Sequence, residues 1–125
     1  MKSPLLEVEN LTIRFRTENG VFDAVKNTSF SMAHGDSLAI VGESGSGKSV
    51  TALSLARLLP TPPAEYPNGR ILFEGEDVLT MNEKQIRAIR GAGIAYVFQE
   101  PATSLNPVYT IHSQIAEGIR LHRSD

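Results

Sequence analysis

The first third of the chain carries the pattern of an antiparallel β-structure. From Leu11 to Phe15 apolar and polar side chains alternate, a period of two that is typical of a strand with one buried face. The Asn19-Gly20 pair tolerates positive φ and predicts a tight turn, so Val21 to Val25 is expected to return as the second strand of a hairpin. Ser29 to Met32 predicts a third short strand, which ends at a polar turn over residues 34–36.

The pattern changes after Ser37. Leu38 to Val41 is a continuous apolar run, as expected of a strand that is covered on both faces. A glycine-rich segment separates it from a helical stretch, Lys48 to Leu59, so the predicted order is strand, loop, helix. The prolines and the Asn68-Gly69 pair between residues 60 and 69 predict an irregular surface loop.

A second hairpin is predicted next, with Arg70 to Phe73 and Val78 to Leu79 flanking a polar turn. Thr80 and Glu83 match the capping box, in which a threonine oxygen accepts a hydrogen bond from a free backbone amide and the glutamate returns one. They predict a helix from Met81 to Arg90, which Gly91 ends.

The C-terminal part predicts one more strand and one more helix. Ile94 to Phe98 has the composition of a buried strand. Thr110 is placed to cap a last helix whose apolar side chains recur every four residues and form one stripe. The residues of this stripe are Ile111, Ile115 and Ile119.

The composition is that of one small soluble domain. The chain has 125 residues, of which 41% are hydrophobic and 21% charged, and this balance excludes disorder, collagen and coiled coil. A net charge of -2 gives no overall field that would draw the chain onto nucleic acid, so anions must bind locally. Without cysteine there is no disulfide and no thiolate site. No apolar run approaches the roughly 20 residues that cross a bilayer, and no export signal is recognisable.

Residues 42–49 match the phosphate-binding pattern G-x-x-x-x-G-K-[ST]. They stand between a predicted strand and a predicted helix, the context in which this pattern is informative. The glycines let successive backbone N–H groups point inward at the positive end of a helix, where triphosphate oxygens fit. The residues of this segment that are expected to contact a nucleotide are Gly42, Glu43, Ser44, Gly45, Ser46, Gly47, Lys48, Ser49 and Val50.

Lys48 and Ser49 supply the reactive chemistry of this loop. The Lys48 ammonium is expected near the β- and γ-phosphates, where two unit charges about 4 Å apart interact by ~4 kcal/mol at an effective dielectric constant of about 20. The Ser49 hydroxyl is expected to bind Mg²⁺. The alternative is a coincidental glycine-rich turn with a solvated lysine.

Gln99, at the end of the predicted strand 94–98, is a second candidate. A P-loop protein needs a carboxylate for its magnesium ion and a group that positions the attacking water. Glutamine stands here where an aspartate would be wanted, and it is neutral and a weak magnesium ligand. The spacing alone leaves two interpretations, a functional side chain or an amide that satisfies backbone groups at a strand end.

Two segments resemble the ATP-binding subunit of ABC transporters. GESGSGKSVTALSLARLLP, residues 42–60, and VFQEPATSLNPVYTIHSQIAEGIRLH, residues 97–122, are similar to the importer branch for dipeptides, oligopeptides, glutathione and nickel. The resemblance covers essentially all of residues 1–125. It implies an α/β P-loop NTPase fold, of which this chain is a part, with an antiparallel β subdomain at the N-terminus and the first half of a mixed core sheet.

The resemblance also implies roles for single residues. Residues 42–49 would be the Walker A motif, which binds ATP with Mg²⁺. Gln99 would be the Q-loop glutamine that reaches the metal, and it would act with Lys48 in catalysis. Phe15 stands where the family places an aromatic ring on adenine, a contact generally worth ~1 to 3 kcal/mol. Phe22 is the rival stacking residue, and a Phe15 side chain that faces the core is the alternative.

The implied partners are transmembrane permease subunits, a second nucleotide-binding domain and, indirectly, a solute-binding protein, with no nucleic acid. The implied location is peripheral, on the cytoplasmic side of the inner membrane. The implied function is to couple ATP hydrolysis to uptake of peptides or a related small solute. Residues 100–110 correspond to the segment that meets the permease, although Pro101 and Pro107 are equally consistent with an ordinary loop.

The 125 residues contain no LSGGQ-like signature, no Walker B aspartate and no catalytic glutamate after it. His112 and His122 precede the place of the signature, so neither corresponds to the switch histidine. This chain alone is therefore expected to hold a nucleotide at most, without hydrolysis. Two other interpretations stay open: a truncated chain that folds poorly and binds nothing useful, and a different P-loop enzyme such as a small-molecule kinase or a GTPase.

Overall fold

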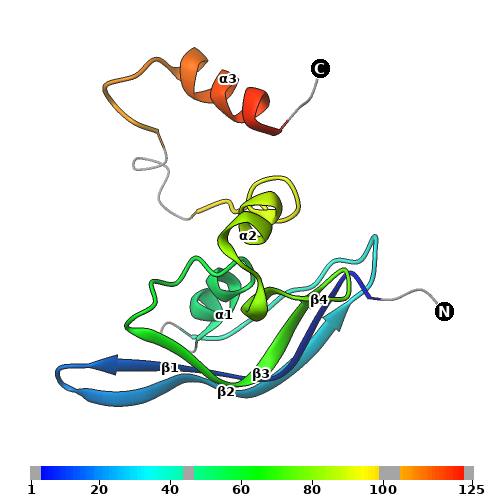
Figure 1. Cartoon of the computed structure of the whole chain (residues 1–125), viewed down its shortest axis with the longest axis vertical. Helices are drawn as coiled ribbons and strands as arrows, with labels where there is room; N and C mark the ends of the chain where they lie inside the picture. The colour runs from blue at the N-terminus through cyan, green and yellow to red at the C-terminus, as the bar shows by residue number, and fades with distance from the viewer. Residues whose placement is uncertain (1–3, 44–46, 99–104, 123–125) are drawn as a thin grey trace. The chain divides into compact units, whose positions relative to one another are not determined.

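The computed structural model describes residues 4–43, 47–98 and 105–122, and the chain divides into two compact units, residues 1–87 and 88–125. The first unit holds a four-stranded antiparallel sheet with the order β2-β1-β3-β4. Its strands are β1 (Leu6–Thr17), β2 (Gly20–Met32), β3 (Ala64–Phe73) and β4 (Glu76–Asp77). Helix α1 (Lys48–Ser54) lies over one face of this sheet (Figure 1).

The first hairpin is confirmed, and Thr17 pairs with Gly20 across its turn. The prediction of two separate strands after the turn is wrong, because residues 20–32 form the single strand β2. The register between β1 and β2 shifts three times between Val8 and Arg14. Two strands can therefore remain paired over their full length although their side-chain alternation is interrupted.

A bulge at Asn10 determines which β1 side chains are buried. Asn10 has a φ of 49°, and on either side of it the buried apolar positions change from even to odd, from Val8 to Leu11 and Ile13. Two hydroxyl groups satisfy the backbone here: the Asn10 amide donates to Ser29 Oγ (2.9 Å) and the Asn27 amide to Thr12 Oγ1 (3.1 Å). The bulge lets both halves of β1 bury apolar side chains on the same side of the sheet.

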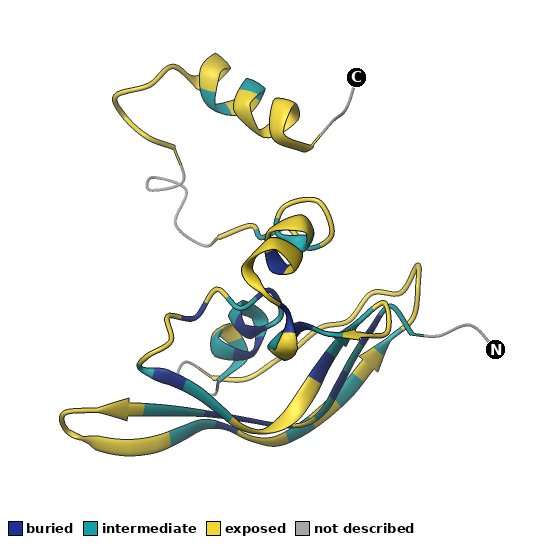
Figure 2. Cartoon of the chain, in the orientation of Figure 1, coloured by how far each residue is buried: buried dark blue, intermediate teal, exposed yellow. Residues whose placement is uncertain are grey.

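The core of the first unit lies on the face of the sheet that α1 covers (Figure 2). Burial of each Val, Leu or Ile side chain stabilises the fold by about 1.5 to 3 kcal/mol. The buried apolar residues are Leu6, Val8, Leu11, Ile13, Val25, Ala56, Leu59, Ala64, Ile71, Val78, Met81 and Ile86. The alternation predicted one buried face of Leu11, Ile13 and Phe15 opposite Thr12 and Arg14. Leu11 and Ile13 are buried as expected, whereas Phe15 is only half-buried and Thr12 is buried as well.

Helix α1 is shorter than predicted. It ends at Ser54 rather than at Leu59, and Arg57 has a left-handed φ of 52° that cannot continue a helix. The predicted loop over residues 60–69 is also wrong in its second half, because β3 begins at Ala64. Gly69 permits this pairing: a Cβ atom there would lie 2.5 Å from Leu11 Cα on β1.

The two apolar runs that were predicted as buried strands are not strands. Leu38 and Val41 are 46% and 89% exposed in irregular backbone, and Val97 is fully exposed. Residues 94–98 contribute only the bridge between Arg90 and Ile94. A strand is stabilised by hydrogen bonds to a neighbour, and within the described part of the chain neither run pairs with a strand of the sheet. The predicted half of a mixed core sheet is thus not formed among residues 4–43, 47–98 and 105–122.

A second hairpin forms as predicted, but its second strand is β4, which lies inside the predicted turn. Val78 and Leu79, predicted as that strand, belong to a short 3-10 helix, η1 (Val78–Thr80). Helix α2 (Glu83–Ile89) follows. Its cap is not the predicted pair Thr80 and Glu83. Instead the Asn82 amide donates to Gln85 Oε1 and the Gln85 amide to Asn82 Oδ1, both at 2.9 Å. Gly91 follows the helix with a φ of 85°, as predicted.

The second unit contains helix α3 (Ile111–His122). Thr110 caps it as predicted, accepting a hydrogen bond from the Ser113 amide at 3.1 Å. Gln114 fastens the preceding loop, because its side chain accepts from the Asn106 amide and donates to the Asn106 carbonyl oxygen. In residues 4–43, 47–98 and 105–122 no helix combines the length and the apolar character needed to cross a membrane.

Candidate functional site

The end of the glycine-rich loop packs directly against β2. Gly47 is the residue before α1, with a left-handed φ of 92°, and a Cβ atom on it would lie 2.6 Å from the Ala24 carbonyl oxygen. Both the backbone conformation and the space therefore require glycine at this position. The contact fixes where the loop enters α1.

Lys48 closes the loop on itself. Its ammonium group donates a hydrogen bond to the carbonyl oxygen of Gly42, the first residue of the motif. Gly42 and Glu43 are exposed, and Ser49 and Val50 lie in the first turn of α1 with Ser49 exposed. Residues 44–46 lie outside the described residues, so the inward orientation expected of their amides stays a prediction.

Thr51 stabilises the first turn of α1 through hydrogen bonds to Gly47, a role that was not predicted from the sequence. Its amide and its hydroxyl group both donate to the Gly47 carbonyl oxygen, at 2.9 and 2.8 Å. The side chain is buried. A threonine in a helix does not by itself indicate such a role, so only its spacing of four residues from Gly47 could have suggested it.

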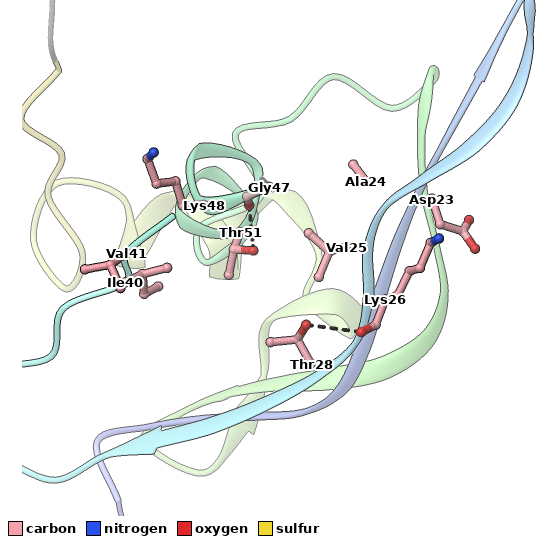
Figure 3. A pocket seen from close by; sticks show the side chains of 10 residues that line it. All are labelled: Asp23, Ala24, Val25, Lys26, Thr28, Ile40, Val41, Gly47, Lys48 and Thr51. Atoms are coloured by element: carbon pink, nitrogen blue, oxygen red, sulfur yellow. Dashed lines mark hydrogen bonds between the residues drawn. The ribbon is translucent and has the colours of Figure 1, made fainter. Parts of the chain in front are cut away.

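An open hollow of about 360 Å³ lies between β2 and the start of α1 (Figure 3). The strand contributes one wall, and α1 with the apolar run before the loop contributes the other. The lining residues are Asp23, Ala24, Val25, Lys26, Thr28, Ile40, Val41, Gly47, Lys48 and Thr51. The β2 residues were missed by the sequence analysis, because strand alternation does not show which loop a strand will contact.

Asp23 is the acidic side chain of this hollow, and it is already paired. The Arg14 guanidinium lies 2.7 Å from its Oδ1 and 3.4 Å from its Oδ2. The hydrogen bond from Arg14 lowers the pKa of Asp23 below its ordinary value; desolvation opposes this effect, and the charges of Arg14 and Lys26 add to it. The carboxylate is therefore ionised at neutral pH, with its charge compensated by Arg14.

Phe15 stacks on a neighbouring ring rather than standing alone. Its ring centroid lies 5.6 Å from that of Phe22 on the paired strand, with 21° between the two planes. Phe15 is half-buried and Phe22 is 55% exposed. Among the described residues that line the hollow, neither ring is present. The assignment of an adenine-stacking role to either ring stays a prediction.

Gln99 lies outside the described residues, so its predicted role is untested. Nor do the described residues contain a cluster of three or more histidine, cysteine, aspartate or glutamate side chains that could hold a metal ion. The one magnesium donor predicted within the described part of the loop is the Ser49 hydroxyl. Such a donor set fits an ion that is held mostly by phosphate oxygens and water.

Comparison of the sequence with known proteins identifies relatives of this chain. The family model described as "ABC transporter" matches residues 25–124. The peptidoglycan transport ATP-binding protein YejF of Agrobacterium fabrum is 50% identical over 97% of this chain and 22% of its own length. The oligopeptide transport ATP-binding protein OppD of Bacillus subtilis is 46% identical over 94% of this chain and 33% of its own length. This chain thus spans about a fifth to a third of these relatives.

Among solved structures, the dimeric ABC transporter cassette MJ0796 superposes with a TM-score of 0.80 at 21% identity, over 96% of this chain and 49% of that one. A second structure of the same cassette, in a post-hydrolysis state with ADP and Pi, gives the same score. These likenesses confirm an α/β P-loop fold with an antiparallel β subdomain. Together with the family match, they show that the chain belongs to the ABC transporter family, as part of its ATP-binding component.

Proposed function

We propose that residues 1–125 form part of a nucleotide-binding domain that powers the uptake of peptides or a related small solute. The observation that carries this proposal is the complete motif at residues 42–49, whose last glycine, Gly47, is fixed against β2 beside a hollow of about 360 Å³. The name of the oligopeptide transport protein OppD supports peptides as the solute class.

Each candidate residue has a proposed role in this site. The amides of residues 42–47 would surround the phosphates, and Lys48 would exchange its bond to Gly42 for one to the β- and γ-phosphates. Ser49 would contribute a ligand to Mg²⁺, which neutralises phosphate charge. Gln99 would complete the metal site, and Phe15 would stack on the base.

We further propose that the intact protein works as a pair of nucleotide-binding domains beneath permease subunits, at the cytoplasmic face of the membrane. A solute-binding protein would deliver the solute to the permease. The 125 residues alone contain no signature sequence and no Walker B carboxylate, so this chain is expected to bind ATP without releasing phosphate.

The test is thermal unfolding of the 125-residue chain with and without MgATP. A ligand at a hundred times its dissociation constant stabilises a folded binder by ~2.7 kcal/mol, which raises the melting temperature by several degrees. The variant Lys48→Ala should lose this shift. The matched control is Lys84→Ala, which removes a lysine on α2, away from the hollow, and should keep it.

No shift in the wild-type chain, or a shift that survives Lys48→Ala, would contradict a functional phosphate loop. The thermal shift with ATP is then compared with the shift with GTP, which tests the remaining alternative, a GTPase. A GTPase should discriminate strongly for guanine, whereas a stacked aromatic ring accepts either purine.

A further inference from the structure

Two buried hydroxyl groups link the core of the first unit to the phosphate loop. The Ser54 hydroxyl donates to the Thr51 carbonyl oxygen at 2.6 Å. The Thr51 hydroxyl in turn donates to the Gly47 carbonyl oxygen at 2.8 Å (Figure 3). Ser54 is 0% exposed and Thr51 is 5% exposed. Thr51 is thus anchored in the core, while its hydroxyl group reaches the last glycine of the motif.

The Gly47 carbonyl oxygen accepts two hydrogen bonds from the same residue. The bond from the Thr51 amide, at 2.9 Å, is the ordinary bond of a helical turn, and any residue except proline supplies it. The bond from the Thr51 hydroxyl needs threonine or serine. Such a bond to the preceding turn slightly destabilises a helix, so the stability of α1 does not explain it. The question is therefore what this second bond does.

The second bond fixes the orientation of the peptide group between Gly47 and Lys48. Gly47 has no Cβ atom and a φ of 92°, so this peptide group can rotate more freely than its neighbours. It is trans, and its C=O and N–H groups therefore point in opposite directions. Because both bonds hold the carbonyl oxygen toward α1, the Lys48 amide is directed toward the loop. A rotated peptide group would present its oxygen to the phosphates instead.

We propose that Thr51 is a positioning residue for the nucleotide, because its hydroxyl group keeps the Lys48 amide turned toward the phosphates. This inference rests on the proposed function and adds to it a residue outside the motif. Thr51 acts through the peptide group, whose orientation is then set before the ligand binds. In a P-loop the backbone amides contact the α- and β-phosphates. The contribution of Thr51 is therefore the same for ADP and ATP.

The test measures the affinities of ADP and ATP for the full 125-residue chain by competition with a fluorescent ATP analogue. Thr51→Val replaces the hydroxyl by a methyl group and should weaken both nucleotides by about fivefold, the effect of one hydrogen bond. Thr51→Ser keeps the hydroxyl and should stay within about twofold of wild type. Thr80→Val is the matched control. It removes another hydroxyl-to-carbonyl bond, to Asp77 and away from the hollow, and should change neither affinity.

The backbone amide of Lys48 supplies a readout of the peptide orientation itself. In the nucleotide-free chain, labelled with ¹⁵N, the Lys48 cross-peak should move in Thr51→Val and return close to its wild-type position in Thr51→Ser. The Gly47 oxygen keeps its bond from the amide of residue 51 in both variants, so circular dichroism should show a retained fold. If the side chain only filled space, the order of the two affinities would be reversed, because valine keeps the volume of threonine and serine does not.

The outcomes separate this inference from the proposed function. If wild type binds and Lys48→Ala does not, but Thr51→Val binds like wild type, the role of Thr51 is overturned and the phosphate loop stands. Equal losses in Thr51→Val and Thr51→Ser, or an unmoved Lys48 cross-peak in Thr51→Val, would also overturn it. If wild type binds neither nucleotide, the proposed function fails, and this inference fails with it.

Discussion

Gly47 approaches the Ala24 carbonyl oxygen so closely that a Cβ atom on residue 47 would lie 2.6 Å from it. The oxygen belongs to the backbone of β2 and cannot rotate away as a side chain would. The same glycine has a φ of 92°, a conformation that side chains rarely adopt. The fold and the phosphate loop thus depend on one glycine for two separate reasons.

Gly47→Ala should therefore destabilise the first unit by about 2 to 6 kcal/mol, since backbone strain and overpacking each cost about 1 to 3 kcal/mol. The matched control is Gly35→Ala, where φ is 83° but no atom lies within 4 Å of an added Cβ. It should cost only the strain. Urea unfolding of both variants measures the difference, and equal losses would show that the contact with Ala24 is unimportant.

The second prediction concerns the two hydroxyl groups at the β1 bulge, whose removal should reduce the stability of the fold by different amounts. Thr12→Val leaves the Asn27 amide without its partner in a part-buried place and should cost about 1 to 3 kcal/mol. Ser29→Ala removes the partner of the Asn10 amide, but that bond is exposed and water can replace it. It should cost less than about 1 kcal/mol. Equal losses in denaturant unfolding would contradict a special role for Thr12.

The cap of α2 gives a third prediction. Asn82→Ala removes one half of the reciprocal pair with Gln85 and should cost about 1 kcal/mol. Thr80→Ala removes only a bond from the Thr80 hydroxyl to the Asp77 carbonyl oxygen and should cost less. A larger loss at Thr80 would restore the cap predicted from the sequence. Unfolding by urea, followed by circular dichroism, measures both.

The cap of α2 shows which features of a helix a local sequence pattern can predict. Thr80 with Glu83 and Asn82 with Gln85 both have the required chemistry and the same spacing. The choice between them depends on η1, which ends at Thr80 and shifts the start of α2 by two residues. Helix existence and its end at Gly91 could be predicted, whereas the first residue depended on a neighbouring element that the pattern did not show.

Contacts between segments that are distant in the sequence explain the other differences between the predicted and the observed structure. The alternation in β1 predicted Leu11 and Ile13 as core, because their burial needs only one sheet face. The strands predicted at residues 38–41 and 94–98 needed neighbours in a parallel sheet, and apolar composition does not supply a partner. For the site, the motif predicted the loop and Lys48 but not the β2 wall, because that contact joins segments more than twenty residues apart.

Acid stability should depend on two ion pairs across the sheet. Hydrogen bonds from Arg14 and Arg16 lower the pKa values of Asp23 and Glu65 below their ordinary 3.8 and 4.5. A carboxyl group with a lowered pKa in the folded state stabilises that state above its unfolded pKa and loses this effect as the pH falls through the folded value. The ion pairs should thus contribute fully near pH 6 and fade below about pH 4.

The double variant Asp23→Asn, Glu65→Gln should make the free energy of unfolding depend less on pH between about 5 and 2, and less on salt near neutrality. Glu117→Gln, on α3 and outside these pairs, serves as the control for the loss of one carboxylate charge. An unaltered profile in the double variant would show that the ion pairs do not persist in solution.

The last prediction compares a buried isoleucine on α2 with exposed isoleucines on α3. Ile86 on α2 is fully buried, and Ile86→Ala should cost about 2 to 5 kcal/mol. The stripe on α3 is exposed instead, with Ile111, Ile115 and Ile119 at 62%, 59% and 52%. Its replacement by three glutamines should change the free energy of unfolding by less than about 0.5 kcal/mol. Because exposed apolar patches promote association, the triple variant should also associate less than wild type in sedimentation at equal concentration. A large loss of stability in that variant would show that the stripe is covered in solution.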